Sequence, residues 1–322
     1  MSYLQTAANI YKQAALIPDI GLCCATTPVW RFPELHIPAK MLEMNYGCGS
    51  TIHPRDLIND PHILYVGVGG GMELLQFAYF SRHPGRILGI DIVDEMLTAA
   101  ALNMIEAEET NSWFSKDYIT LRKGDALALP VADAFVDIAA QNCLFNIFKT
   151  DDLIKALREM YRVLKPGGRL VMSDPICEQP MSESLRQNEQ LRALCLSGAI
   201  PLDDYVRMLT DIGFGTIEIR SRRPYRLLPP GQYETDTLLY IESIEVCAIK
   251  DPMPVDGPCV FSGKTAIYYG QNDYFEDEKG HILYKNRPLP ICDKTASAFA
   301  GLSRPDIFIS PATYHYDGGG CC

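Results

Sequence analysis

The stretch that decides the fold is Tyr65-Val66-Gly67-Val68-Gly69-Gly70-Gly71. It follows an apolar run at residues 63–66 and precedes an amphipathic stretch at residues 72–80. A strand, a glycine-rich turn and a helix in this order are typical of the first unit of a doubly wound α/β sheet. Glycines let backbone N–H groups approach a ligand closely, and the helix presents its positive N-terminal end. We therefore expect a nucleotide-like ligand at this turn.

Further apolar runs follow, with stretches of helical periodicity between them. They lie at residues 86–90, 119–121, 136–140 and 169–172. The clearest helix is predicted over residues 151–164, where Lys165-Pro166-Gly167-Gly168 ends it. This alternation predicts the α/β class with a Rossmann-like, doubly wound and mainly parallel sheet. Helices are expected around residues 183–195 and 202–212. Runs at residues 216–220 and 238–249 are expected to close the sheet as an antiparallel pair.

The chain divides into four predicted regions. Residues 1–60 form an N-terminal arm, a short helix followed by a proline-containing segment that excludes a long helix. Residues 61–175 form the nucleotide-binding domain, and residues 176–250 a substrate-binding region that closes the sheet. Residues 251–322 form a C-terminal extension, which starts at a Pro- and Gly-containing linker and ends in Gly-Gly-Gly-Cys-Cys.

Composition excludes several classes of protein. Hydrophobic residues make up 47% and charged residues 21% of the 322 residues, which excludes a disordered chain. The 29 basic against 40 acidic residues give a net charge of -11, which argues against a nucleic-acid partner. No run is long and apolar enough for a membrane helix, and residues 1–22 lack the pattern of a signal peptide, so we expect a cytoplasmic protein. The 6 histidines lack the spacing of a zinc site.

The chain has 11 cysteines and no CxxC pair, which excludes a zinc ribbon and a thioredoxin-type motif. Three contexts are unusual: Cys23-Cys24, Cys48 between two glycines, and Cys195 before Ser-Gly-Ala. We expect the flanking glycines to keep the thiol of Cys48 accessible. Three thiolates in a trigonal arrangement suit a soft centre such as trivalent arsenic. Three cysteines in or just after apolar strands are expected to be buried small hydrophobes. These are Cys143, Cys177 and Cys247.

Two acids follow the second and third predicted strands. Asp91 is placed to accept hydrogen bonds from ribose hydroxyls, and Asp125 to accept one from an adenine amino group. The glycine turn reads G-x-G-G-G rather than the dinucleotide pattern G-x-G-x-x-G, and no basic residue is placed for a phosphate. An adenosine ligand without phosphates, such as S-adenosylmethionine, therefore suits these residues better than NAD.

The glycine turn, Asp91, residues 124–130 and residues 158–168 together resemble the motifs of class I, Rossmann-like, S-adenosylmethionine-dependent methyltransferases, over residues 60–175. One departure is Tyr65, where the family often carries an acid that contacts the methionine end of the cofactor. The resemblance implies a set of cofactor contacts. They are Gly67, Gly69, Gly71, Asp91, Ile92, Met96, Asp125, Ala126 and Asn142.

Outside this core, several segments resemble arsenite methyltransferases, especially forms from arsenosugar-producing microbes. They are Cys23-Cys24, Tyr46-Gly47-Cys48-Gly49, residues 195–202, residues 263–270, residues 290–296 and residues 315–322. The resemblance implies that Cys48 and Cys195 bind As(III), and that Cys24 assists turnover and extends the arsenic-binding set. It places a fourth family cysteine at Ser243, four residues before Cys247.

This resemblance implies methyl transfer from S-adenosylmethionine to the arsenic lone pair, with glutathione or thioredoxin as the external thiol reductant. A monomer is expected. Two alternatives stay open. A small-molecule C- or O-methyltransferase of the quinone or sterol type predicts an apolar pocket and indifference to Cys48→Ser. A non-catalytic, thiol-rich metalloid-binding protein predicts arsenite binding without turnover.

Overall fold

The computed structural model describes residues 2–19, 22, 32–231 and 237–316. Cys23, Cys24, Cys321 and Cys322 lie outside the described residues. No described helix has the length and apolar character needed to cross a membrane.

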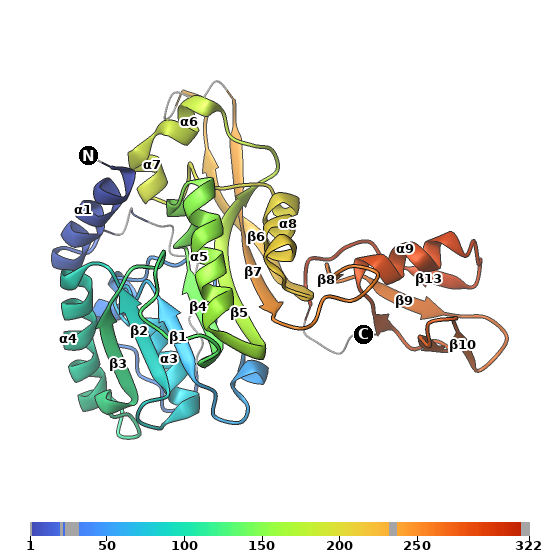
Figure 1. The fold of residues 1–322 in the computed structure, drawn as a ribbon, viewed down its shortest axis with the longest axis horizontal. Coiled ribbons are helices and arrows are strands. Elements are labelled where there is room, and N and C mark those ends of the chain that lie inside the picture. The colour runs from blue at the N-terminus through green and yellow to red at the C-terminus, as the bar shows by residue number, and fades with distance from the viewer. Residues whose placement is uncertain (1, 20–21, 23–31, 232–236, 317–322) are drawn as a thin grey trace.

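A mixed sheet of 8 strands, in the order β3-β2-β1-β4-β5-β7-β6-β8, forms the centre of the molecule (Figure 1). The first five strands pair in parallel, and β7 is antiparallel to both β5 and β6. The strands are β1 (Ile63–Val66), β2 (Ile87–Asp91), β3 (Ile119–Lys123), β4 (Val136–Asn142), β5 (Leu164–Cys177), β6 (Thr216–Leu228), β7 (Leu239–Ile249) and β8 (Cys259–Phe261). The predicted doubly wound sheet with its antiparallel closing pair is confirmed.

Helices cover both faces of the sheet, because the strands are apolar on both sides. In β1, Ile63 and Tyr65 belong to one core cluster and Leu64 and Val66 to the other. The first cluster packs under α3 (Met72–Ser81) and α4 (Asp94–Thr110), and the second under α5 (Thr150–Val163) and α8 (Leu202–Ile212). The predicted helix over residues 151–164 is thus α5.

The N-terminal arm begins with α1 (Tyr3–Leu16), which lies against α4 and against α7 (Glu189–Ala193). Shorter helices are α2 (Ala39–Glu43), η1 (Pro54–Leu57), η2 (Lys116–Tyr118), η3 (Phe145–Ile147) and α6 (Glu183–Gln187). The single helix predicted around residues 183–195 is wrong. The helix is interrupted at Asn188. The side chain of Asn188 accepts the Leu191 N–H at 3.0 Å and so caps α7 as a separate helix.

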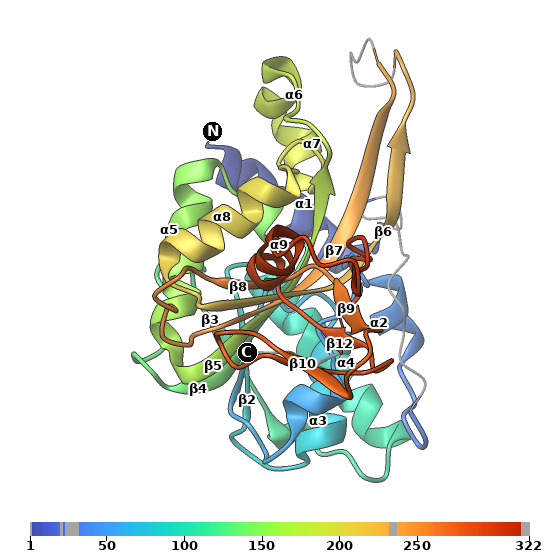
Figure 2. The same cartoon turned by 90° about the vertical axis from the view of Figure 1, so that its right-hand side faces the viewer.

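The C-terminal extension contributes β8 to the main sheet, where this strand pairs in parallel with β6. The rest forms a small unit at one end of the molecule (Figures 1 and 2). It consists of β9 (Thr265–Tyr268), β10 (Tyr274–Glu276), β11 (Ile282–Tyr284), β12 (Leu289–Pro290), α9 (Asp293–Gly301) and β13 (Ile307–Ile309). Its core includes Tyr268, Leu283 and Phe299. The main sheet therefore reaches into residues that the sequence assigned to the extension.

Candidate active site

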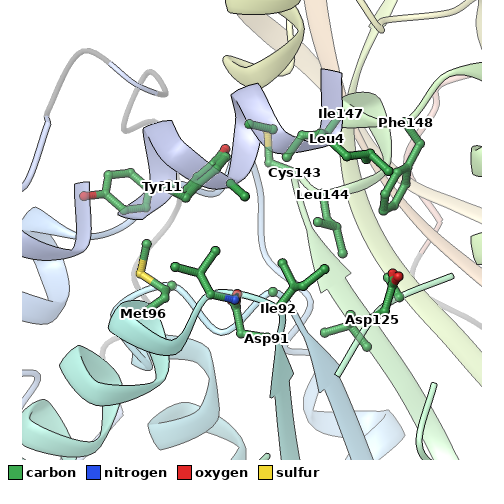
Figure 3. Close-up of a pocket in the computed structure, with 18 of the residues that line it drawn as sticks. Leu4, Tyr11, Asp91, Ile92, Met96, Asp125, Cys143, Leu144, Ile147 and Phe148 are labelled. Carbon is green, nitrogen blue, oxygen red and sulfur yellow. The ribbon is translucent and has the colours of Figure 1, made fainter. Parts of the chain in front are cut away.

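A pocket opens at the carboxyl ends of β1, β2 and β4, beneath α1 (Figure 3). It has about 910 Å³ of space, counting its open mouth. Leu4 and Tyr11 of α1 lie on one side, facing Ile92 and Met96 on the other. The position agrees with the rule that ligands of doubly wound sheets bind outside the carboxyl ends of the strands.

All the predicted cofactor residues except Gly71 line this pocket. They are Gly67, Gly69, Asp91, Ile92, Met96, Asp125, Ala126 and Asn142. Gly71 lies outside the lining and begins α3 with φ +87°. A Cβ added there would lie 2.6 Å from Cε of Met104 on α4, so this glycine lets the two helices pack closely.

Asp91 is the anchored acid of the pocket. Its Oδ2 accepts the Val68 N–H at 2.9 Å and its Oδ1 accepts the Val93 N–H at 2.9 Å. Burial raises the pKa of this carboxyl to about 6, so it is mainly ionised at neutral pH. Asp125 is exposed at the rim and accepts the Leu127 N–H at 2.9 Å.

The chemistry of the lining fits an adenosine ligand without phosphates. The pocket offers two carboxylates for hydroxyl and amino donors, and apolar walls that include Val93, Leu144 and Phe148. None of the described side chains in its lining is basic. S-adenosylmethionine fits this donor and acceptor set, whereas a pyrophosphate would find no cation there.

Cys48 lies on a loop, residues 46–51, that is fixed to the sheet by side chains from four elements. Asn142 of β4 accepts the Cys48 N–H at 2.9 Å and donates to the Gly49 carbonyl at 2.8 Å. Glu245 of β7 accepts the Ser50 N–H at 2.8 Å. Glu73 of α3 accepts the Thr51 N–H and hydroxyl, both at 2.9 Å. Ser173 of β5 lies with its Oγ 3.3 Å from the Cys48 Sγ.

The expectation that glycines keep the Cys48 thiol accessible is wrong, because Cys48 is completely buried. The glycines have a different role. A Cβ on Gly47 would lie 2.4 Å from the Asn142 side chain, and one on Gly49 would lie 2.1 Å from the Ser173 Oγ. The loop can rest on these two side chains only because both positions lack a side chain.

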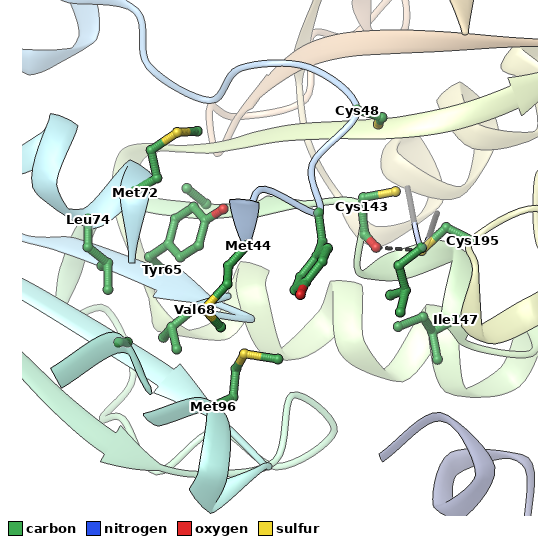
Figure 4. Close-up of a cluster of buried hydrophobic side chains, with 14 of the residues drawn as sticks. Met44, Cys48, Tyr65, Val68, Met72, Leu74, Met96, Cys143, Ile147 and Cys195 are labelled. Atoms are coloured by element: carbon green, nitrogen blue, oxygen red, sulfur yellow. Dashed lines mark hydrogen bonds between the residues drawn. The ribbon is translucent and has the colours of Figure 1, made fainter. Parts of the chain in front are cut away.

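Cys195 is also buried, and it lies two residues after the end of α7. Its thiol donates to the Cys143 carbonyl at 2.6 Å (Figure 4). The small-residue turn that follows packs against η3, because a Cβ on Gly198 would lie 1.8 Å from the Asn146 carbonyl oxygen. Cys24, the third predicted thiol, lies outside the described residues.

Cys143 is the site residue that sequence reasoning missed. It is buried as expected, but it lines the pocket directly after Asn142. Its N–H donates to the Ser173 carbonyl at 2.7 Å, so contacts run continuously from Cys48 through Ser173 and Cys143 to Cys195. Its place at the carboxyl end of β4, beside a predicted cofactor residue, is the signal that could have found it.

Both Cys143 and Cys195 have left-handed backbones, with φ +60° and +58°. Residues other than glycine seldom adopt this backbone conformation. Such backbone strain is concentrated at functional sites. The two residues that meet through the 2.6 Å contact are therefore held in an uncommon geometry by the surrounding fold.

Comparison with known proteins agrees with this geometry. A family model described as a methyltransferase domain matches residues 64–172. An arsenic(III) S-adenosylmethionine methyltransferase from Chlamydomonas reinhardtii has a similar crystal structure, with a TM-score of 0.61 at 22% identity, covering 90% of this chain and 99% of that one.

Residues 64–172 therefore match a methyltransferase domain, and the chain has the fold of the class I methyltransferases. The predicted fold and enzyme class are thereby confirmed, with S-adenosylmethionine as the methyl donor.

The similarity to relatives in sequence extends beyond the nucleotide-binding domain. The arsenite methyltransferase of Aquipseudomonas alcaligenes is 28% identical over 286 residues, covering 85% of this chain and 80% of that protein. The arsenite methyltransferase of Halobacterium salinarum is 28% identical over 180 residues, covering 56% of this chain and 44% of that protein. A demethylmenaquinone methyltransferase of Lactiplantibacillus plantarum is 32% identical over 121 residues, 38% of this chain and 48% of that one.

Tyr65 lies outside the lining of the methyltransferase pocket, and its hydroxyl donates to the buried carboxylate of Glu73. Glu73 also accepts from the Asn142 amide at 3.2 Å. Burial raises the pKa of Glu73, while its hydrogen-bond donors favour the ionised form. The acid that the sequence lacks at position 65 is therefore replaced by one in the first turn of α3, and this acid contacts the pocket lining through Asn142.

Two further cysteines lie away from the pocket lining. Cys177 donates to the Ala199 carbonyl at 3.3 Å. Cys247 is completely buried near the end of β7, opposite Val171 of β5, and burial raises its pKa to about 12. Ser243, four residues earlier on the same face, lies opposite Pro175. The buried character predicted for Cys177 and Cys247 is confirmed.

Proposed function

We propose that this methyltransferase acts on arsenite, transferring methyl groups to As(III) held by the thiolates of Cys48, Cys143 and Cys195, and that Cys24 assists turnover. The observation that carries the proposal is a chain of contacts beside the pocket, which links cysteines of three separate segments through the Ser173 hydroxyl and the backbone carbonyls of Ser173 and Cys143. The similarity to proteins named arsenite methyltransferases supports the same substrate.

Thiolate chemistry suits this substrate. Three thiols react with one As(OH)₃ to form three As–S bonds and three water molecules, so the protons of the thiols leave as water. Soft sulfur ligands favour a soft centre, and a trigonal set leaves the arsenic lone pair free on the opposite side. Cys143 would hold arsenic beside the methyl donor, because it lines the donor pocket itself.

When bound, S-adenosylmethionine supplies the methyl group from its sulfonium. The carboxylates of Asp91 and Asp125 orient the adenosine, and the glycine turn at Gly67 and Gly69 leaves room for it. The thiolates fix arsenic, so proximity and orientation provide the acceleration. No proton is removed from arsenic, and a general base is unnecessary.

Methylation raises arsenic formally from As(III) to As(V). In the proposal, two site thiols give up two electrons and form a disulfide, which returns arsenic to As(III). An external thiol, glutathione or thioredoxin, then reduces that disulfide. The proposal includes a monomeric protein in the cytoplasm and a cellular role in arsenic detoxification, with first steps toward arsenosugars as a further role.

An organic acceptor is the second candidate. The walls of the pocket are mostly apolar, with Leu4 and Ala7 from α1 and Ile147 and Phe148 beside η3, and such walls also suit a quinone-like substrate. This candidate predicts that the three cysteines can be replaced without loss of methyl transfer.

The test is methyl transfer by the purified protein with arsenite, S-adenosylmethionine and glutathione, followed by separation of the methylated arsenicals. We expect product from the wild type, and a loss of about a hundredfold in Cys48→Ser, Cys143→Ser and Cys195→Ser. Cys292→Ser is the control, because Cys292 is buried in the C-terminal extension, 3.2 Å from the Thr295 hydroxyl. Undiminished product in the three site variants would refute the proposal.

A further inference from the structure

A second pocket adjoins the methyl-donor pocket, with Phe148 lining both. It has about 540 Å³ of space, counting its mouth. Its walls come from the start of α5, from α6 and α7, and from residues 197–200, the turn that follows Cys195. Neither the methyl donor nor the proposed arsenic ligands account for this pocket.

The second pocket is positively charged in an otherwise acidic protein. Lys149, Arg186 and Arg192 line it, and Glu183 is the one acid in its described lining. The Glu183 side chain is 72% exposed, lies 3.9 Å from Arg186 and accepts from the Gln187 amide at 2.6 Å. The whole chain has a net charge of -11, so a concentration of three cations is a local feature.

Arg192 is the central cation because it is 94% buried, with only 6% of its surface exposed. Its Nη1 donates to the Phe148 carbonyl at 3.0 Å and its Nη2 to the Arg186 carbonyl at 2.8 Å. Both partners are neutral, and no carboxylate of the described residues forms an ion pair with this guanidinium. Burial accordingly lowers the pKa of Arg192.

Two acids on the adjoining helices α7 and α5 contact hydroxyl groups of α1 instead of Arg192. Glu189 accepts from the Thr6 hydroxyl at 2.8 Å, and Asp152 accepts from the Tyr3 hydroxyl. Proteins rarely bury a cation without an anion, because the cost of removing its hydration is not offset. The missing anion is therefore expected to be a ligand.

We propose that this cationic pocket binds a carboxylate of a small thiol of the glutathione class, the co-substrate that reduces the site after methylation. The inference rests on the proposed function for its choice of a thiol. A carboxylate matches the planar, two-pronged donor face of Arg192. The Arg192 backbone carbonyl accepts the Cys195 N–H at 2.9 Å, so the backbone that carries this arginine also carries a proposed arsenic ligand.

The binding test uses S-methylglutathione, which keeps the carboxylates and cannot reduce or bind arsenic. Isothermal titration with the full-length protein should show binding that Arg192→Met weakens by about tenfold, the effect of losing a charge-assisted hydrogen bond. Arg207→Met is the matched control, because Arg207 is an exposed arginine that pairs with Asp204 on α8. Its affinity should equal that of the wild type. Binding of S-adenosylhomocysteine should be unchanged in both variants, which shows that the fold is intact.

Three results would overturn the inference: no binding of S-methylglutathione to the wild type, equal affinity in wild type and Arg192→Met, or binding of inorganic phosphate in its place. If Arg192→Met does not fold, Arg186→Met and Lys149→Met take its place, and unchanged affinity in both would overturn the inference. The titration contains no arsenic, so its outcome does not depend on the proposed substrate. In turnover, Arg192→Met should raise the KM for glutathione while the KM for S-adenosylmethionine stays constant.

Discussion

Replacement of Glu73 by glutamine would change the buried contact between the Cys48 loop and the donor pocket with almost no change in volume. The carboxylate receives four donors: the Thr51 N–H and hydroxyl at 2.9 Å, the Asn142 amide at 3.2 Å and the Tyr65 hydroxyl. All four are matched to an ionised carboxylate, which has only acceptor sites. Glutamine replaces one acceptor oxygen with an NH₂ group.

The cost follows from which oxygen is lost. The oxygen that accepts two hydrogen bonds from Thr51 is best kept, so the new NH₂ group faces the NH₂ of Asn142, and two donors oppose each other. One buried donor left without an acceptor costs about 1–3 kcal/mol. If the Asn142 amide rotates to avoid this, the Cys48 N–H loses its acceptor instead. Either way the Cys48 loop is weakened, and we expect arsenite affinity to fall about tenfold.

Isothermal titration of Glu73→Gln with arsenite, and separately with S-adenosylhomocysteine, would test this expectation. Arsenite affinity should fall by more than the nucleoside affinity, since the disturbed contacts hold the thiol loop. Tyr65→Phe is the control, because it removes one donor from the same carboxylate and leaves the Asn142 contact in place. Arsenite affinity that is unchanged in Glu73→Gln, or equally reduced in Tyr65→Phe, would refute the reasoning.

Two further predictions concern the elements that support the site. Burial raises the pKa of Asp174, which accepts from Gln141 and from the Tyr205 hydroxyl at 3.1 Å, to about 7. Because the native state keeps this proton up to a higher pH than the unfolded chain does, stability should fall as pH rises from 4 to 7, by on the order of 4 kcal/mol. Urea unfolding of Asp174→Asn should lack this component, and an identical pH dependence in the variant would contradict the assignment. Gly198→Ala should destabilise the protein by about 1–3 kcal/mol and reduce arsenite methylation, because its Cβ would lie 1.8 Å from the Asn146 carbonyl oxygen. Gly301→Ala, which has open space around its Cβ, should match the wild type in both measurements.

Short-range patterns in the sequence determined the fold and the methyl-donor pocket. Strand, turn and helix are encoded by neighbouring residues, and parallel strands bring their carboxyl ends to one edge. Asp91 and Asp125 could therefore be placed together without knowledge of any contact between them, whereas Asn142 was expected only from the family resemblance. The single helix expected around residues 183–195 was wrong because a local cap at Asn188 outweighed the helical periodicity.

Only the tertiary structure decided how the thiols are arranged and what supports them. Cys48 meets Ser173 across 125 positions of sequence, and Cys195 meets Cys143 across 52. Such pairings depend on how the loops cross the sheet, which no periodicity encodes. For the same reason, the sequence could not indicate the contacts of Glu73, the burial of the Arg192 charge or the role of the glycines around Cys48. A residue's neighbours in the sequence indicate its secondary structure, but its function here depends on residues that folding brings from elsewhere in the chain.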